Sequence, residues 1–120
     1  MDRNKRKELL EQYKQVKTYM GVVKITNQAN GKIYVEGYPN LKNKWMTIKA
    51  QLEMGRFANL QLQSDWKRLG GGAFSYEELE RKEADEVADV RWELKQMKKL
   101  WLEKLQPYGD RGYNKLSAER

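Results

Sequence analysis

The sequence predicts an α+β domain, a small three-stranded antiparallel sheet flanked by helices. Two short runs rich in β-branched and aromatic residues are separated by an Asn-Gly pair, which is typical of a β-hairpin. Apolar residues at three- and four-residue steps indicate helices before and after this hairpin. A further strand-like run lies between the later helices. A hairpin, one more strand and covering helices together satisfy the layered architecture of an α+β fold.

The first part of the chain predicts a helix and the hairpin. Residues 4–17 carry apolar side chains on one stripe and charges elsewhere, as an amphipathic helix does. Residues 18–27 predict the first strand, 28–31 the turn, and 32–35 the second strand.

Two helices are expected after the hairpin. Asn40 is the expected N-cap of a helix that runs to about Met54 and ends at Gly55. A second helix is expected over residues 60–69. The apolar stripes of these helices predict their core contacts: Leu41, Trp45, Ile48, Leu52, Leu62, Trp66 and Leu69.

The last part predicts a strand over residues 73–79 and a long helix over 85–105, which Pro107 ends. The glycines at 70–72 predict a turn, because the Lys-Ser or Lys-Thr pair of a phosphate-binding loop does not follow them. Trp92 lies off the apolar stripe of the helix, so we expect it to be exposed. That stripe comprises Val87, Val90, Leu94, Met97, Trp101 and Leu105.

The composition restricts the class of protein. A length of 120 residues predicts one domain. Cysteine and histidine are absent, so disulfides, thiolate metal sites and imidazole chemistry are excluded. Because no apolar run approaches the length of a membrane span, we expect a soluble, cytoplasmic protein without a membrane partner. The net charge of +7 favours a polyanionic partner, although lysine-rich helices also promote solubility alone.

Gly21-Val22-Val23 and Tyr34-Val35-Glu36 lie on the two strands of the predicted hairpin, with the stretch NGKIYV leading into the second. The stretches LKNKW, LQLQSDW, WLEKLQP and GYN follow along the chain. The order and spacing of these stretches resemble the GIY-YIG nuclease family, with the two tripeptides matching its GIY and YIG segments. The resemblance covers about residues 19–114. It implies a GIY-YIG-like domain over 18–116, preceded by a helical extension over 1–17.

The resemblance also implies a chemistry, the hydrolysis of a phosphodiester with a divalent cation. In this family a tyrosine near the strands helps to activate water, and an arginine on the first helix supports the phosphate charge. A glutamate on the last helix holds the cation, consistent with the preference of such ions for oxygen ligands. Tyr34 and Asn114 match family residues, whereas the lost tyrosine, arginine and glutamate are matched by Val23, Lys44 and Lys98.

These three replacements each remove part of the chemistry. Val23 has no proton to exchange, and Lys44 lacks the planar fork with which a guanidinium grips phosphate. An ammonium at Lys98 repels the cation that a carboxylate would hold. We therefore predict no cofactor and a catalytically silent site, in which Tyr34, Lys44 and Asn114 are vestigial.

Glu36 stands where the family has glycine, on the same strand face as Tyr34. If these residues line one concavity with Lys44 and Lys98, a carboxylate and two cations share it. We predict that Glu36 lies within salt-bridge reach of Lys98 or Lys44. A partly exposed pair of this kind contributes only about 0–1 kcal/mol.

Three functions fit the sequence. The first, which we favour, is binding of nucleic acid, in particular DNA, by a basic surface. The second is an atypical endonuclease that uses Mg²⁺ or Mn²⁺ with Glu36 as a relocated metal ligand. The third is a protein-interaction module, with residues 4–17 contacting a second copy or another protein. The residues predicted to bind nucleic acid are Lys42, Lys44, Lys49, Arg56, Lys67 and Arg68.

Overall fold

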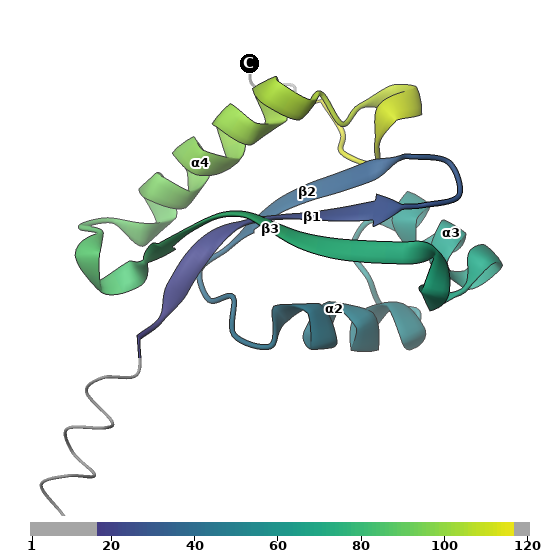
Figure 1. Cartoon of the computed structure of the whole chain (residues 1–120), viewed down its shortest axis with the longest axis horizontal. Helices are drawn as coiled ribbons and strands as arrows, with labels where there is room; N and C mark the ends of the chain where they lie inside the picture. The colour runs from purple at the N-terminus through teal and green to yellow at the C-terminus, as the bar shows by residue number, and fades with distance from the viewer. Residues whose placement is uncertain (1–16, 117–120) are drawn as a thin grey trace, which may run out of the picture.

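The computed structural model describes residues 17–116, and within them a three-stranded antiparallel sheet lies between two layers of helices (Figure 1). Strand β1 (Tyr19–Asn27) is central, with β2 (Ile33–Tyr38) and β3 (Phe74–Glu83) on either side. The predicted α+β class and antiparallel sheet are confirmed. The predicted extension over residues 1–17 and its helix over 4–17 lie almost wholly outside the described residues.

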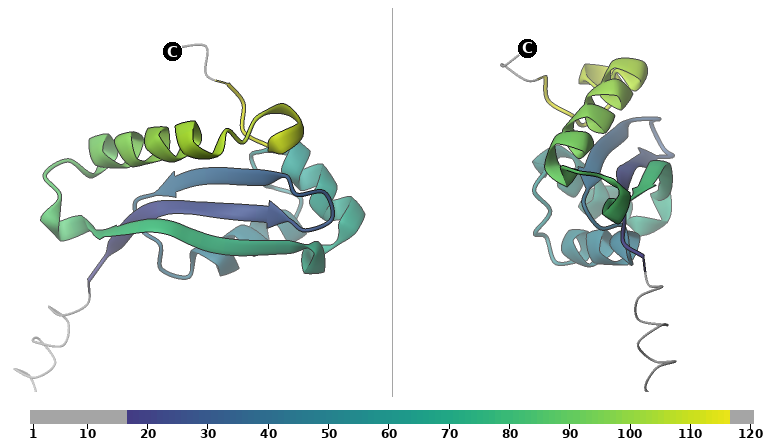
Figure 2. Two further views of the ribbon diagram at one scale, coloured as in Figure 1. Left: turned by 45° about the horizontal axis from the view of Figure 1, so that its top comes forward. Right: turned by 90° about the vertical axis from the view of Figure 1, so that its left-hand side faces the viewer.

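Helices cover both faces of this sheet (Figure 2). Helix α4 (Val90–Leu105) packs on one face, and α2 (Lys44–Glu53) and α3 (Leu60–Leu69) pack on the other. Short 3₁₀ turns at Gly71–Ala73, Ala84–Glu86 and Gly109–Arg111 connect or follow these elements. Within residues 17–116 no helix is both long and apolar enough to cross a membrane.

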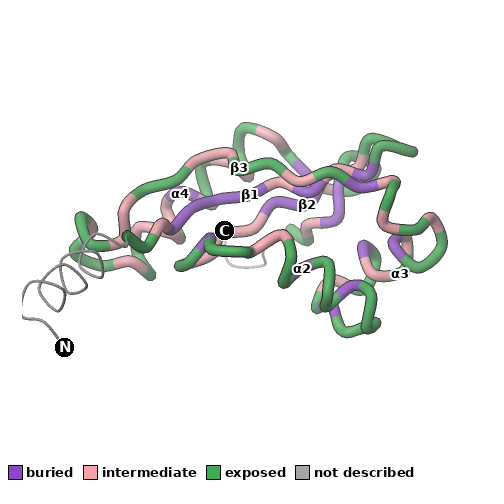
Figure 3. The backbone as a smooth tube through the Cα atoms, turned by 60° about the horizontal axis from the view of Figure 1, so that its bottom comes forward, coloured by how far each residue is buried: buried purple, intermediate pink, exposed green. Residues whose placement is uncertain are grey.

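The alternation of side chains along β1 divides the interior into two cores. Met20 and Val22 pack beneath α4, whereas Ile25 packs with α2 and α3. Because successive residues of a strand point to opposite faces, a single central strand supplies both clusters. Figure 3 shows this as a nearly continuous buried stretch along β1.

The predicted hairpin turn is confirmed. The Asn27 amide donates to the Lys32 carbonyl at 2.8 Å, and the Gly31 amide donates to the Asn27 carbonyl at 2.8 Å. Gly31 has a φ of 79°, a left-handed conformation that glycine adopts without steric cost.

The predicted N-cap of the first helix is wrong. The Asn40 side chain accepts a hydrogen bond from the Lys42 amide at 3.0 Å, so it closes a tight turn and does not cap a helix. Helix α2 begins only at Lys44, after Asn43 in the left-handed conformation. For α3, the Asn59 side chain is the cap and accepts from the Leu62 amide at 3.0 Å.

The third strand is longer than predicted and the last helix is shorter. Strand β3 remains paired with β1 as far as the Tyr19–Glu83 pair, so it extends well past Leu79. A register shift between Val22 and Val23 places the extra residue in this long strand. The predicted helical segment that begins at residue 85 is therefore a 3₁₀ turn first, and α4 starts at Val90. Strand β2 likewise continues three residues beyond the predicted range, to Tyr38.

The predicted apolar stripes do form the cores. Trp66 is buried, and Trp45 and Trp101 are half-buried against the two clusters. Trp92 is 58% exposed, as predicted from its place off the stripe of α4.

The structure predicts that Gly21→Ala destabilises the fold. A Cβ at this position would lie 2.1 Å from the Glu80 carbonyl oxygen, so β1 and β3 would have to separate. We expect a loss of about 1–3 kcal/mol in the free energy of unfolding, measured by chemical denaturation. Gly72→Ala is the matched control, because a Cβ there meets nothing within 4 Å. Equal effects of the two substitutions would contradict the close approach of the strands.

Candidate functional site

The candidate site lies at the β2 edge of the sheet. Tyr34 packs beneath α2 and α3, whereas Val35 points to the opposite face and packs against α4. Lys98 of α4 therefore reaches around the edge of the sheet, and its Nζ lies 2.8 Å from Oε1 of Glu36. The predicted salt bridge is confirmed, with Lys98 and not Lys44 as the partner.

The carboxylate of Glu36 accepts hydrogen bonds at both oxygens. Its Oε1 accepts from the Gly37 amide at 2.8 Å as well as contacting Lys98, and its Oε2 accepts from the Tyr34 hydroxyl at 3.2 Å. The side chains of Glu36 and Lys98 are 27% and 34% exposed. Glu36 thus accepts from three donors, and the ion pair remains partly exposed to solvent.

Tyr34 is held in place by its surroundings. It is buried, and its ring packs edge-to-face on Phe57 with centroids 5.6 Å apart. Burial, reinforced by the neighbouring charge of Glu36, raises the pKa of the Tyr34 phenol well above its usual value. The phenol therefore keeps its proton near neutral pH and acts as a hydrogen-bond donor, not as a base.

Val23 lies directly across the strand pair from Glu36 and is fully buried. Its apolar side chain can neither donate nor accept a proton. This part of the site is therefore a packing surface.

Lys44, the first residue of α2, lies over the ring of Tyr38, with Nζ 4.4 Å from the ring centroid. This is a cation–π contact. Burial, and then the charge of Glu36, raises the pKa of the Tyr38 phenol. Lys44 thus borders the site through Tyr38, and the recorded salt bridge of Glu36 is with Lys98.

Asn114 holds the chain segment after α4 against the edge of β2. Its amide group accepts from the Val35 amide at 2.9 Å and donates to the Val35 carbonyl at 2.7 Å. The Tyr113 amide adds a bond to the Ile33 carbonyl at 2.9 Å. The structure therefore gives Asn114 an architectural contact, in which its side chain pairs with backbone like a neighbouring strand.

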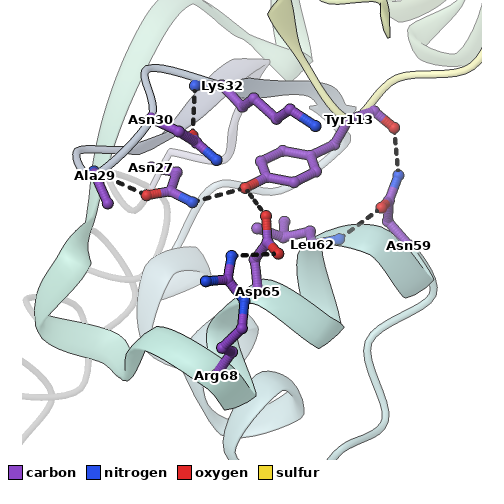
Figure 4. A network of polar contacts seen from close by, with 9 residues as sticks. All are labelled: Asn27, Ala29, Asn30, Lys32, Asn59, Leu62, Asp65, Arg68 and Tyr113. Atoms are coloured by element: carbon purple, nitrogen blue, oxygen red, sulfur yellow. Dashed lines mark hydrogen bonds and ion pairs between the residues drawn. The ribbon is translucent and has the colours of Figure 1, made fainter. Parts of the chain in front are cut away.

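A polar network that we did not predict from the sequence anchors the same segment (Figure 4). The Tyr113 hydroxyl accepts from the Asn27 side chain at 2.9 Å and donates to Asp65 at 2.7 Å. Asn59 donates to the Tyr113 carbonyl at 2.7 Å. The hydrogen bond from Tyr113 lowers the pKa of Asp65, and Arg68 acts in the same direction. The polar residues at the end of β1 and within α3 were the only sequence features that could have indicated this network. Local sequence patterns do not show that these residues contact one another.

The residues predicted to bind nucleic acid lie on α2, α3 and the adjoining loops, on one side of the sheet (Figure 1). We call them the α2–α3 surface. Arg68 is paired with Asp65 at 3.2 Å, and Lys49 lies 5.4 Å from the ring centroid of Trp45. The α2–α3 surface consists of Lys42, Lys44, Lys49, Arg56, Lys67 and Arg68, all exposed except the half-buried Lys44.

The GIY-YIG resemblance implies a divalent cation, but the side chains at the β2 edge do not fit one. Glu36 is the carboxylate that contacts Tyr34, and its two oxygens already accept three donors. The ammonium of Lys98 occupies its immediate neighbourhood and would repel a cation. Among residues 17–116 no group of three or more acidic side chains is arranged to hold a metal ion.

Comparison with known proteins supports the fold. The catalytic domain of the homing endonuclease I-TevI is similar at 23% identity and a TM-score of 0.66, over 82% of this chain and 99% of that domain. A mutant of the catalytic domain of intron endonuclease I-TevI is similar at the same identity and TM-score, over 80% and 92%. The chain has a GIY-YIG-like nuclease fold. No family model and no curated protein matched the sequence. Within this GIY-YIG-like fold, the assignment of catalytic and binding positions stays a prediction.

The Glu36–Lys98 pair should have a small coupling energy. Because both side chains are partly exposed, we expect a double-mutant cycle with Glu36→Gln and Lys98→Met to give less than about 1 kcal/mol. Chemical denaturation of the four proteins measures it. A coupling of about 3 kcal/mol would contradict this prediction and would indicate a desolvated pair.

Asp65 should contribute to acid sensitivity. Its pKa is lowered in the folded protein, so its stabilisation is complete above the ordinary value of 3.8 and is lost as the pH falls through the lowered value. Asp65→Asn should therefore flatten the dependence of unfolding free energy on pH below about 4. The exposed Glu77→Gln serves as the control. If both variants kept the acid slope of the unmodified protein, the Tyr113–Asp65 contact would not carry this effect.

Proposed function

We propose that this protein is a GIY-YIG nuclease-like domain that binds nucleic acid, with DNA as the partner, and does not cleave phosphodiester bonds. The contact between Lys98 and Glu36 is the observation that carries the proposal. It places a positive charge and a carboxylate that already accepts from three donors together beside Tyr34, where the resemblance implies a cation.

Loss of cleavage follows from the state of each group. Metal-dependent hydrolysis needs an ion that polarises the phosphate and activates water. A cation that bound Glu36 would have to compete with the Lys98 ammonium, the Gly37 amide and the Tyr34 hydroxyl. Burial raises the pKa of the Tyr34 phenol above its usual value, which makes the ionised form that a general base needs still less accessible.

Nucleic-acid binding is supported by the charge of the α2–α3 surface. Among the described residues, no salt bridge is recorded for Lys42, Arg56 or Lys67, and their side chains are exposed. Unpaired cations on one side of a small domain neutralise backbone phosphates and release counterions. A surface of this kind binds nucleic acid mainly through the phosphate backbone.

Two other functions make different predictions. An atypical endonuclease would nick DNA with Mg²⁺ or Mn²⁺, and Glu36→Ala would abolish the nicking. A protein-interaction module would show neither nicking nor salt-sensitive DNA binding. The three functions can be distinguished with the same protein preparation.

The test combines a binding titration with a nicking assay. Fluorescence anisotropy with a labelled duplex, repeated over a salt series, should show binding that weakens steeply as salt rises, without divalent ions. Lys42→Ala, Arg56→Ala and Lys67→Ala combined should reduce the slope of log K against log salt by about 3, near one unit for each lost phosphate contact. Supercoiled plasmid with Mg²⁺ or Mn²⁺ should remain intact.

A charge-matched variant controls for net charge. Arg91, Lys95 and Lys99 are exposed on α4, on the opposite side of the sheet. Their combined substitution by alanine removes the same charge and should leave most of the affinity and slope in place. Equal losses in the two triple variants would refute the assignment to the α2–α3 surface, and nicking by the unmodified protein would refute the silent site.

A further inference from the structure

The groups that surround Glu36 have the composition of an oxyanion site. Three donors of different origin converge on its carboxylate, namely the Lys98 ammonium, the Gly37 backbone amide and the Tyr34 hydroxyl. Charged and backbone donors aimed at one point are the usual means by which proteins bind phosphate and other oxyanions. We infer that Glu36 acts as a built-in ligand of this site, which binds a phosphate oxyanion once the Glu36 side chain is removed.

Two of the donors are held by contacts that do not involve Glu36. Tyr34 is fixed by burial and by its packing on Phe57. Gly37 packs so closely on Leu94 of α4 that an added Cβ would lie 3.0 Å from that side chain. Helix α4 fixes the backbone of Lys98, and Glu36 is the recorded partner of its ammonium within residues 17–116. The Tyr34 and Gly37 donors should therefore keep their places when the carboxylate is absent, and the Lys98 ammonium is then available to an anion.

The charge balance then favours an anion. Without Glu36, the ammonium of Lys98 loses the partner recorded for it within residues 17–116. Lys44 lies next to the site, over the ring of Tyr38. Tyr34 remains a donor because burial alone opposes its ionisation. A phosphate oxyanion offers several charged acceptor oxygens to these donors, and hydrogen bonds to a charged acceptor are stronger than hydrogen bonds to water.

In the unmodified protein the site is closed by its own side chain. A group attached to the same chain has an effective concentration in the millimolar range or higher, roughly as for a short linker. Dissolved phosphate therefore competes poorly with Glu36. This inference goes beyond the proposed function: it concerns a small-anion site at the β2 edge, whereas the α2–α3 surface is a separate set of residues.

The test is a titration of the Glu36→Ala protein with inorganic phosphate. Two-dimensional NMR monitors the amide resonance of Gly37 at each phosphate concentration. Glu36→Ala should show a saturable shift of this resonance, and the unmodified protein should show none at the same concentrations. Adding Lys98→Ala should weaken phosphate binding by at least roughly tenfold, the equivalent of about 1.4 kcal/mol. Sodium chloride at matched ionic strength separates binding from screening.

Glu103→Ala is the matched control, because it removes one exposed carboxylate from α4 far from Gly37 in the sequence. It should behave like the unmodified protein. A folded Glu36→Ala protein whose Gly37 amide ignores phosphate would overturn the inference, as would an equal response of the unmodified protein. If alanine prevents folding, Glu36→Ser provides the same opening. Failure of DNA binding leaves this result unaffected, so the two proposals fail separately.

Discussion

The double packing of β1 is the constraint on which the rest of the structure depends. This strand is paired on both edges and covered on both faces, and its alternate residues supply two separate cores. Gly21 allows the backbone of β3 to approach it closely. With β1 fixed in this way, β2 is placed at an edge, where one side chain can emerge beneath α2 and α3 and meet another that comes from α4. The Glu36–Lys98 contact is possible only at such an edge.

The same arrangement explains why the site is both well bonded and open. A carboxylate in the interior would require complete compensation of its lost hydration. At the edge of the sheet, Glu36 combines a backbone amide, a phenol and an ammonium with residual exposure to water. The result is a local and moderate stabilisation, because solvent screens the pair.

Sequence reasoning predicted those parts of the structure that depend on local patterns. The Asn-Gly hairpin, the apolar stripe of Ile48 and Leu52, and the exposure of Trp92 all follow from periodicity or turn chemistry. The Glu36–Lys98 contact was predicted only because the family resemblance placed two distant segments side by side. The end of β3 was predicted too early because residues 80–83 are highly charged, although pairing with β1 holds them in a strand.

The network around Tyr113 could not be predicted from local patterns. It joins the end of β1, α3 and the segment after α4, and each of its bonds spans many residues. Secondary-structure propensities carry no information about contacts between residues so far apart in the sequence. Asn114 has the same character, because its pairing with the backbone of Val35 depends on where Pro107 and the following turn direct the chain.

The composition of β3 has a consequence for self-association. Among residues 17–116 no strand pairs with the outer edge of this ten-residue strand, and a free edge of that length allows another chain to extend the sheet. Six of these ten residues are charged, four of them glutamates. Charged side chains along an exposed edge strand oppose the edge-to-edge pairing by which sheets extend into aggregates. The same charged residues that make β3 an atypical strand sequence therefore disfavour self-association at this edge of the sheet.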